Sequence, residues 1–514
     1  MRVLDANAMR EVDRIAVEKI GIPSVVLMEN AAIGLVDAIG ERYPEAMSAA
    51  IFCGPGNNGG DGLALARHLS IRGYQIEINL VTGDGDMRGD ALVQLDICRN
   101  SGLAIQEFGP EDSIQQSMES ASRMDLVVDA LFGTGLTRPL VGHFAEAVQA
   151  MNVLSVPCVA VDLPSGLNAS SAEYMGPHVQ SEITVTFAAP KIAHILLPAA
   201  EAAGEVVVAD LGIPVDLIEN ASGHLHLLTK EDLTGLVAPR PVASHKGDYG
   251  HALIVAGSMG KAGAAILAAR GAVRSGAGLV TVATPESIAQ TVDLGSVESM
   301  TIPLTSNSSG GLGESNAATI LDLAMDKQVL AVGPGLGTEL ETVEIVRSIV
   351  EQSKIPVVLD ADGLNCFVGA TDLLASGGAP RVLTPHPGEL ARLLGVTVQE
   401  IQVDRMSRVL EGARCTRSVM VLKGNQTLIA DPEGSVFVNT TGNPGMATGG
   451  AGDVLTGIIA GLICQGHDAS TAACLGVFVH GVAGDISRAA LGEASLTAAD
   501  LLADLPEAIQ QLQP

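Results

Sequence analysis

Short aliphatic runs alternate with glycine-rich turns and helix-period segments along most of this 514-residue chain, and this alternation constrains the fold most strongly. Runs of this length, bounded by turn residues, are typical of buried parallel strands joined by crossover helices. The pattern therefore predicts an α/β fold. The runs are residues 49–53, 76–81, 125–130, 156–161 and 183–187, followed by 252–256, 279–283, 329–332, 357–359, 382–384 and 419–422.

The alternation breaks down once, over residues 213–243, where polar residues and Pro214, Pro239 and Pro241 take its place. A chain of this length exceeds one ordinary hydrophobic core. We therefore predict two domains, residues 1–218 and 224–512, with the boundary near 216–224.

Charge and composition exclude several classes of function. Lys and Arg number 29 against 58 Asp and Glu, which gives a net charge of −29 and no basic field for a nucleic acid. The seven cysteines form no CxxC pair, as expected of buried reduced thiols. Charge appears early at the N-terminus, and no apolar stretch reaches the roughly 20 residues of a membrane span. We expect a cytoplasmic protein with neither nucleic-acid nor membrane partners.

Three strand ends in the first domain carry unusual residues. They are the glycine-rich segment 54–62, Asp129 followed by Gly133-Thr134-Gly135, and Asp162 followed by Leu163-Pro164-Ser165-Gly166. Taken singly, each aspartate could be a turn or helix cap. Because ligands collect at the carboxyl ends of parallel strands, three such ends favour a shared pocket.

These segments, with Leu27-Met28-Glu29-Asn30-Ala31, resemble the NAD(P)HX epimerase family over roughly residues 1–215. The resemblance implies a Rossmann-like three-layer αβα domain that interconverts the R and S forms of hydrated NADH and NADPH (NADHX and NADPHX). It implies potassium ligands at Asn58, Asp129 and Ser165. It implies substrate contacts from Asn57, Asn58, Gly59, Gly60, Asp61, Gly133, Thr134, Gly135, Leu136, Thr137, Arg138, Pro139 and Asp162.

The residue types suit this chemistry. Amide, carboxylate and hydroxyl oxygens are ligands for a hard cation, and Asp162 can act as acid or base at the carbon being inverted. Lys191, just past the next strand, is a second catalytic candidate, although alone it is typical of a solvated surface lysine. The sequence leaves the acid/base assignment between Asp162 and Lys191 open.

In the second domain, Gly449-Gly450-Ala451-Gly452-Asp453 opens an apolar helix. Glycines before a helix N-terminus form a nest of amides for a phosphoryl group, and Asp453 could take a proton from an attacking hydroxyl. The structural alternative is a left-handed turn with a capping aspartate. No Gly-Lys-Ser/Thr follows, so this is not a Walker loop.

This motif resembles ribokinase-like kinases, and further segments narrow the resemblance to ADP-dependent NAD(P)HX dehydratase over roughly residues 224–512. Those segments are residues 244–250, 257–258, 262–265, 274–278, 333–337, 360–365, 384–389 and 421–424. The resemblance implies a ribokinase-like α/β domain with ADP as co-substrate and Mg²⁺. It implies that the hydrated dinucleotide contacts Ala264, Gly335, His386 and Asp453, and that the adenine nucleotide contacts Lys423, Gly424, Asn425, Gln426, Thr427 and Gly452. Asp360 and Asp362 could help hold magnesium or substrate, or serve a turn.

The sequence therefore predicts a bifunctional enzyme that epimerises R- and S-NAD(P)HX and dehydrates the S form with ADP, releasing NAD(P)H, AMP and phosphate. Both resemblances suggest a homo-oligomer. The alternative is a ribokinase-like kinase of a small vitamin alcohol with an N-terminal ligand-binding module. That alternative does not explain Thr384-Pro385-His386-Pro387-Gly388-Glu389.

Overall fold

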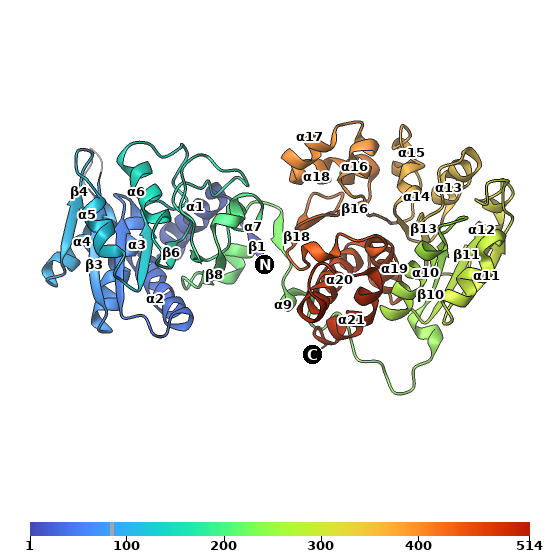
Figure 1. Ribbon diagram of the computed structural model, residues 1–514, viewed down its shortest axis with the longest axis horizontal. Helices are drawn as coiled ribbons and strands as arrows, with labels where there is room; N and C mark the ends of the chain where they lie inside the picture. The colour runs from blue at the N-terminus through green and yellow to red at the C-terminus, as the bar shows by residue number, and fades with distance from the viewer. Residues whose placement is uncertain (83–86, 514) are drawn as a thin grey trace. The chain divides into compact units, whose positions relative to one another are not determined.

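The computed structural model describes residues 1–82 and 87–513, and its chain divides into two compact units (Figure 1). One unit comprises Arg2–Leu225, and the other comprises His226–Pro514 together with Met1. Each unit is built on a largely parallel sheet flanked by helices, so the predicted α/β fold class is confirmed.

The first unit has a seven-stranded, all-parallel sheet in the order β4-β3-β2-β5-β6-β7-β8. The sequence pattern missed β4 and β8, because these edge strands are partly exposed and mostly lack the continuous apolar character of central strands. The strands are β2 (Ser48–Cys53), β3 (Gln75–Val81), β4 (Ile105–Phe108), β5 (Leu126–Ala130), β6 (Cys158–Val161), β7 (Ile183–Phe187) and β8 (Glu205–Ala209).

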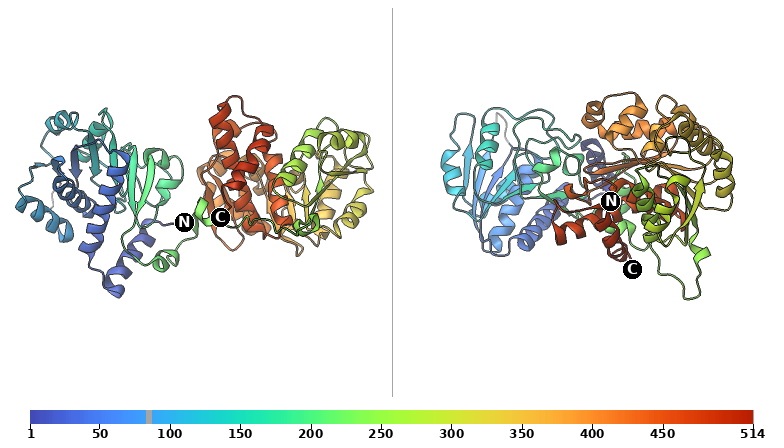
Figure 2. Two further views of the ribbon diagram at one scale, coloured as in Figure 1. Left: turned by 90° about the horizontal axis from the view of Figure 1, so that it is seen from below. Right: turned by 45° about the vertical axis from the view of Figure 1, so that its right-hand side comes forward.

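Helices cover both faces of this sheet and complete three layers (Figure 2). Ile51 of β2 lies in one core with α2, α3 and α4, whereas its neighbour Phe52 points into a second core with α5 and α6. The remaining elements are β1 (Arg2–Val3), α1 (Ala6–Ile15), α2 (Ser24–Arg42), α3 (Asn57–Ile71), α4 (Gly89–Asn100), α5 (Gln115–Ala121), α6 (His143–Asn152), α7 (Ile192–Ile195) and α8 (Val215–Glu219).

In the second unit the strands run in the order β9-β18-β17-β16-β15-β14-β13-β10-β11-β12. Strands β10 to β16 pair in parallel, but β16, β17 and β18 form antiparallel hairpins that the sequence pattern did not predict. The strands are β9 (Leu225–Leu227), β10 (His251–Val255), β11 (Leu279–Pro285), β12 (Met300–Leu304), β13 (Val329–Val332), β14 (Val357–Leu359), β15 (Arg381–Leu383), β16 (Val419–Leu422), β17 (Thr427–Ala430) and β18 (Val436–Asn439).

Helices α10 and α19 pack unusually closely in the core of this unit. A Cβ added at Gly457 would lie 2.0 Å from the Ala268 carbonyl oxygen, and one added at Gly271 would lie 2.6 Å from that of Val454. The helices are α9 (Lys230–Leu233), α10 (Ala262–Arg274), α11 (Glu286–Gly295), α12 (Asn316–Ala324), α13 (Leu340–Gln352), α14 (Asp362–Asn365), α15 (Asp372–Ala375), α16 (Pro387–Leu394), α17 (Val398–Val403), α18 (Arg405–Thr416), α19 (Ala451–Cys464), α20 (Ala469–Leu491) and α21 (Ala498–Gln510).

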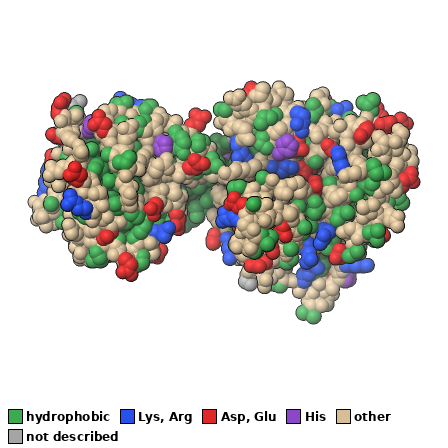
Figure 3. Space-filling model, viewed as in Figure 1, with side chains coloured by type: hydrophobic (Ala, Val, Ile, Leu, Met, Phe, Trp, Pro, Cys, Tyr) green, Lys and Arg blue, Asp and Glu red, His purple; other side chains and the backbone are tan. Residues whose placement is uncertain are grey.

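Among the described residues, only α20 is long and apolar enough to cross a membrane by length and composition. The most apolar stretch of this helix is 67% buried within the unit, as expected of a core helix. All seven cysteines are free, and all except Cys415 are buried. Acidic and basic side chains are interspersed on the face shown in Figure 3.

Candidate functional site

A cavity of about 610 Å³ opens in the first unit beside the carboxyl ends of β2, β5 and β6. The predicted residues that line it are Asn57, Asn58, Asp61, Gly133, Thr134, Gly135, Leu136, Asp162 and Lys191. The cavity thus brings together all three strand ends singled out in the sequence.

Other predicted substrate residues do not line this cavity. Gly59 and Gly60 are buried, and a Cβ at Gly59 would lie 1.9 Å from the Gly54 carbonyl oxygen, which points to a close backbone approach. Thr137, Arg138 and Pro139 are exposed beyond the lining.

The Asn57–Asp61 segment forms the first turn of α3, although the sequence pattern placed it in a loop before the helix. Gly56 is the N-cap residue, so no side chain at this position accepts a hydrogen bond from the first N–H groups of the helix. The first N–H groups of a helix have no partner within the helix and favour an anion. This arrangement suits a phosphate-bearing ligand.

Asp162 and Lys191 form a buried ion pair, with 2.7 Å between Lys191 Nζ and Asp162 Oδ1. The ammonium also donates to Thr186 Oγ1 at 2.7 Å and to the Phe187 carbonyl at 3.0 Å. Lys191 is 1% exposed, so its interpretation as a solvated surface lysine was wrong. Burial raises the pKa of Asp162, but Lys191 and the Thr186 hydroxyl outweigh it and hold the pKa below its usual value. Asp162 is therefore ionised at neutral pH, and its φ of 62° is a strained conformation typical of functional sites.

Asp13, which belongs to no predicted motif, reaches the same cavity from α1. Burial raises its pKa to about 6. A signal was present: Met9, Val12 and Ala16 form the buried side of this helical segment, and Asp13 adjoins it. Asp13 lies on the first helix, whereas the motifs of this unit lie at strand ends.

In the second unit, α19 begins at Ala451 after Gly450, whose φ is 95°. Asp453 is the third residue of the helix and makes no cap, so the capping alternative was wrong. Burial, then the charge of Asp360, raises the pKa of Asp453 to about 6, although Lys423 acts in the opposite direction. A carboxyl with this pKa can accept a proton near neutral pH.

Asp360 contacts both Lys423 and α19, the helix that carries Asp453. Its Oδ1 lies 2.7 Å from Lys423 Nζ, and its Oδ2 accepts the Thr456 hydroxyl of α19 at 2.7 Å. Glu389 lies 3.9 Å from the same ammonium. A Cβ on Gly452 would be 3.3 Å from Lys423 Nζ, so the glycine keeps this corner open.

His386 is the N-cap of α16, and its backbone N–H donates to Glu389 at 2.8 Å. Its Nδ1 accepts the Gly388 N–H at 3.0 Å, and the side chain is 51% exposed. Because Glu389 also faces Lys423, the capping arrangement connects His386 to the Asp360 cluster.

Gly335 and Ala264 lie side by side, since a Cβ on Gly335, at φ 67°, would be 3.1 Å from the Ala264 Cβ. The Ser258 hydroxyl donates to the Gly335 carbonyl at 2.7 Å. Asp362 accepts the Gly337 N–H at 2.9 Å and pairs with Lys261 at 3.1 Å. Asp362 therefore supports this turn.

The predicted nucleotide segment, residues 423–427, comprises the turn between β16 and β17 and the first residue of β17. Arg405, which belongs to no predicted motif, donates to the Asn425 carbonyl and lies against Gly424. No spacing in the sequence connects Arg405 to this turn, because the contact is made across the fold.

Comparisons with known proteins cover both units. The family model for NAD(P)H-hydrate dehydratase matches residues 252–507, and that for the YjeF-related protein N-terminus matches residues 24–193. Bifunctional NAD(P)H-hydrate repair enzymes from Moorella thermoacetica and Thermofilum pendens are 42% and 38% identical, each over 100% of this chain and 97% of their own length. The chain belongs to this family.

A crystal structure of the ADP/ATP-dependent NAD(P)H-hydrate dehydratase from Bacillus subtilis, grown with ATP and Mg²⁺, is also similar. It is 33% identical with a TM-score of 0.50, and the match covers 57% of this chain and 100% of that one. Membership of the bifunctional repair family confirms the prediction made from both resemblances and removes support for the vitamin-alcohol kinase.

The potassium ion implied for the epimerase unit fits the residues present. Asp129 is fully buried and accepts the Ser165 N–H and hydroxyl at 2.7 and 2.6 Å, but pairs with no cationic side chain within the described ranges. Burial accordingly raises its pKa to about 6. Asn58 is buried, its Nδ2 has no hydrogen-bond partner among the described residues, and its Oδ1 would lie 2.8 Å from a Cβ on Gly133. One carboxylate with neutral oxygens suits a monovalent hard cation.

Magnesium fits the second unit in a different way. Within the described part of the chain, no three His, Cys, Asp or Glu side chains gather to hold a metal. Mg²⁺ commonly binds through one or two carboxylates and the phosphates of its nucleotide. The residues present therefore suit magnesium that arrives with the nucleotide.

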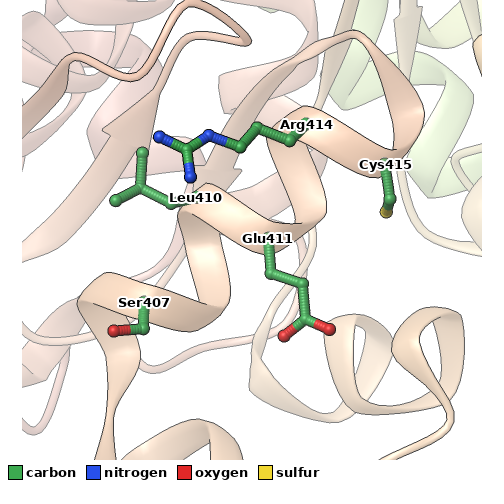
Figure 4. A pocket seen from close by; sticks show the side chains of 5 residues that line it. All are labelled: Ser407, Leu410, Glu411, Arg414 and Cys415. Carbon is green, nitrogen blue, oxygen red and sulfur yellow. The ribbon is translucent and has the colours of Figure 1, made fainter.

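A separate recess of about 560 Å³ lies on α18 and contains none of the predicted residues (Figure 4). Ser407, Leu410, Glu411, Arg414 and Cys415 line it. Burial and the Glu411 charge raise the pKa of the Cys415 thiol, which disfavours the reactive thiolate. We assign no activity to this recess.

Proposed function

We propose that the two units repair hydrated nicotinamide nucleotides in sequence. The first unit interconverts R- and S-NAD(P)HX, and the second dehydrates the S form with ADP, giving NAD(P)H, AMP and phosphate. The observation that carries the second assignment is Asp453 beside the Asp360–Lys423 pair, directly after the glycine nest of α19.

In the dehydration, Asp453 accepts the proton of the substrate hydroxyl, whose oxygen attacks the terminal phosphorus of ADP and displaces AMP. The N–H groups at the start of α19 stabilise the transferring phosphoryl group. The phosphate ester is a better leaving group than hydroxide. Phosphate therefore departs as the ring loses a proton, which restores the reduced nicotinamide.

Lys423 is the second positive element of this site. Its contacts with Asp360 and Glu389 hold the ammonium beside Gly452. We propose that it contacts the nucleotide phosphates together with residues 424–427, while Ala264, Gly335 and His386 contact the hydrated dinucleotide. Bound magnesium supplies neutralising charge for the nucleotide phosphates.

In the first unit, we propose that the first turn of α3 and residues 133–136 bind the dinucleotide, and that Asp162 and Lys191 serve the proton transfers. Asn58, Asp129 and Ser165 would hold potassium. Replacing K⁺ by tetramethylammonium should slow epimerisation in the wild type, and Asp129→Asn should abolish the response to K⁺. An unchanged K⁺ response in this variant would remove the cation assignment.

We further propose that the chain works in the cytoplasm as a homo-oligomer on small-molecule substrates, without a nucleic-acid or membrane partner. Family membership supports the small-molecule substrates. Light scattering of the purified chain measures the oligomeric state.

The dehydration is tested with pure S-NADHX and ADP, by following NADH absorbance and quantifying AMP and phosphate. We expect all three products in equal amounts, and none above background when ADP is omitted. Accumulation of a phosphorylated alcohol from another substrate, without formation of NADH, would instead favour a kinase.

A further inference from the structure

Of the four carboxyl groups that line the first cavity, Asp162 and Asp61 lie in opposite electrostatic surroundings. Asp162 receives a hydrogen bond and a positive charge from Lys191, and a second hydrogen bond from Thr186. Asp61 lines the same cavity from α3, and its carboxyl makes no hydrogen bond or ion pair with any residue of the described ranges. The negative charge of Asp162 is therefore compensated by Lys191, whereas the charge of an ionised Asp61 would have no partner among the described residues.

The charged groups around Asp61 come from several elements. Asp13 and Arg10 reach the cavity from α1, Asp90 from α4, and Asp162 and Lys191 from beyond β6 and β7. On α2, the Glu29 carboxylate pairs with Arg67 and His68 of α3.

Within the described ranges, neither cationic side chain that lines the cavity, Arg10 or Lys191, forms an ion pair with Asp61. Lys191 is paired with Asp162, and Arg10 donates to the Asn7 side chain and to the Ala6 carbonyl. A carboxyl enclosed by other carboxylates and lacking a cation retains its proton. Burial, then the charges of Asp162 and Asp13, raises the pKa of Asp61 well above its usual value, against a smaller opposing effect of Lys191.

We propose that Asp61 is the proton donor and Asp162 the proton acceptor of epimerisation, and that Asp13 is a positioning residue whose charge keeps the proton on Asp61. This inference rests on the proposed epimerase function. Neighbouring carboxyls whose surroundings favour opposite protonation states are the usual way in which one site supplies both an acid and a base.

The substrate is a carbinolamine, in which the carbon that carries the hydroxyl is bonded to the ring nitrogen. Asp61 gives its proton to the hydroxyl, the C–O bond breaks, and water leaves with the bonding electrons. The nitrogen lone pair meanwhile forms a C=N⁺ bond. A solvent water then adds to the other face of this carbon, and Asp162 takes its proton.

One water leaves and one is added, so atoms and charge balance. After one turnover Asp61 is ionised and Asp162 is protonated, which is the state required for the reverse conversion. Exchange of protons with solvent restores the resting state.

The test follows conversion of pure R-NADHX to the S form by the full chain, using chromatography, for wild type and three variants. We expect Asp61→Asn to slow epimerisation by about 10²–10⁴-fold, the usual size of a general-acid contribution. Asp13→Asn removes a negative charge near Asp61, so the alkaline limb of the pH–rate profile should move to lower pH. Asp90→Asn is the matched control. Asp90 lines the same cavity, but it is not among the charged groups that shift the pKa of Asp61.

ADP-dependent dehydration of the S epimer by the same preparations reports that each chain is folded. Epimerisation by Asp61→Asn within threefold of wild type would overturn the donor role, and an unmoved alkaline limb in Asp13→Asn would overturn the positioning role. In H₂¹⁸O, the S product should contain more ¹⁸O than the product formed in buffer without enzyme. An unlabelled product would overturn the loss and re-addition of water. If the wild type interconverts the epimers no faster than buffer does, the proposed epimerase function itself fails.

Discussion

At the scale of single residues, Asp453 is held in a position that costs stability. Its pKa of about 6 lies above the ordinary 3.8, because burial and Asp360 disfavour the charged form. The folded chain therefore binds this proton more tightly than the unfolded chain does. Stability is lost as the pH rises from about 4 to 6, and the full cost is present at pH 7.

Asp453→Asn should therefore separate activity from stability. Dehydration should fall by about 10²–10⁴-fold through loss of the general base. The free energy of unfolding at pH 7 should rise by up to about 3 kcal/mol, since the shift is about two pKa units, and the difference should vanish near pH 4. Thermal unfolding at both pH values measures the second effect. A less stable variant with near-normal turnover would contradict both assignments.

The same pKa predicts how dehydration depends on pH. A base must be ionised, so kcat at saturating ADP should rise about tenfold per unit below pH 6 and level off above it. Initial rates of NADH formation between pH 5 and 8 measure this. A flat profile over that range would assign the base to a different group.

At the scale of elements, the close packing of α10 and α19 holds Asp453 in position. Gly457→Ala would place a methyl group 2.0 Å from the Ala268 carbonyl oxygen, which neither helix backbone can avoid. We expect a loss of at least about 1–3 kcal/mol, the usual cost of overpacking, with slower dehydration and unchanged epimerisation.

Gly263→Ala in α10 is the matched control for this prediction. A Cβ at Gly263 has nothing within 4 Å, and alanine favours a helix, so this variant should be neutral or slightly more stable. Equal losses in the two alanine variants would show that helix spacing is not the cause.

Element prediction from sequence worked where burial is complete and failed at sheet edges. The continuous aliphatic runs of β13, β14 and β16 marked their strands without error in bounds. Strand β12 was missed because it is half exposed, and β17 and β18 because they form hairpins. The sequence pattern predicts helices that begin at Leu63 and Val454, but α3 begins at Asn57 and α19 at Ala451. The earlier starts were missed because glycines are typical of loops.

Site residues were also predicted only in part from the sequence. Motifs indicated Asp162 and Asp453, whereas the burial of Lys191 depends on a partner 29 positions away and could not be predicted from spacing. Asp13 and Arg405 reach the sites from helices outside every motif. Their roles follow only from three-dimensional contacts.

At the scale of the whole molecule, the predicted boundary near residues 216–224 implies two domains that fold separately. Chains ending at 218 and starting at 224 should each be soluble, unfold cooperatively, and carry epimerisation and dehydration respectively. Circular dichroism melts and the two assays check this on separately expressed pieces. Aggregation of both pieces would argue against the boundary.

If one chain recovers both epimers, a mixture of R- and S-NADHX with excess ADP should be converted completely. With the wild type, NADH absorbance should rise until both epimers are converted. With Asp162→Asn it should stop at the S fraction and continue only at the spontaneous rate of epimerisation. A wild-type yield that stops at the S fraction, or a complete lack of NADH formation, would show that the chain does not recover both epimers.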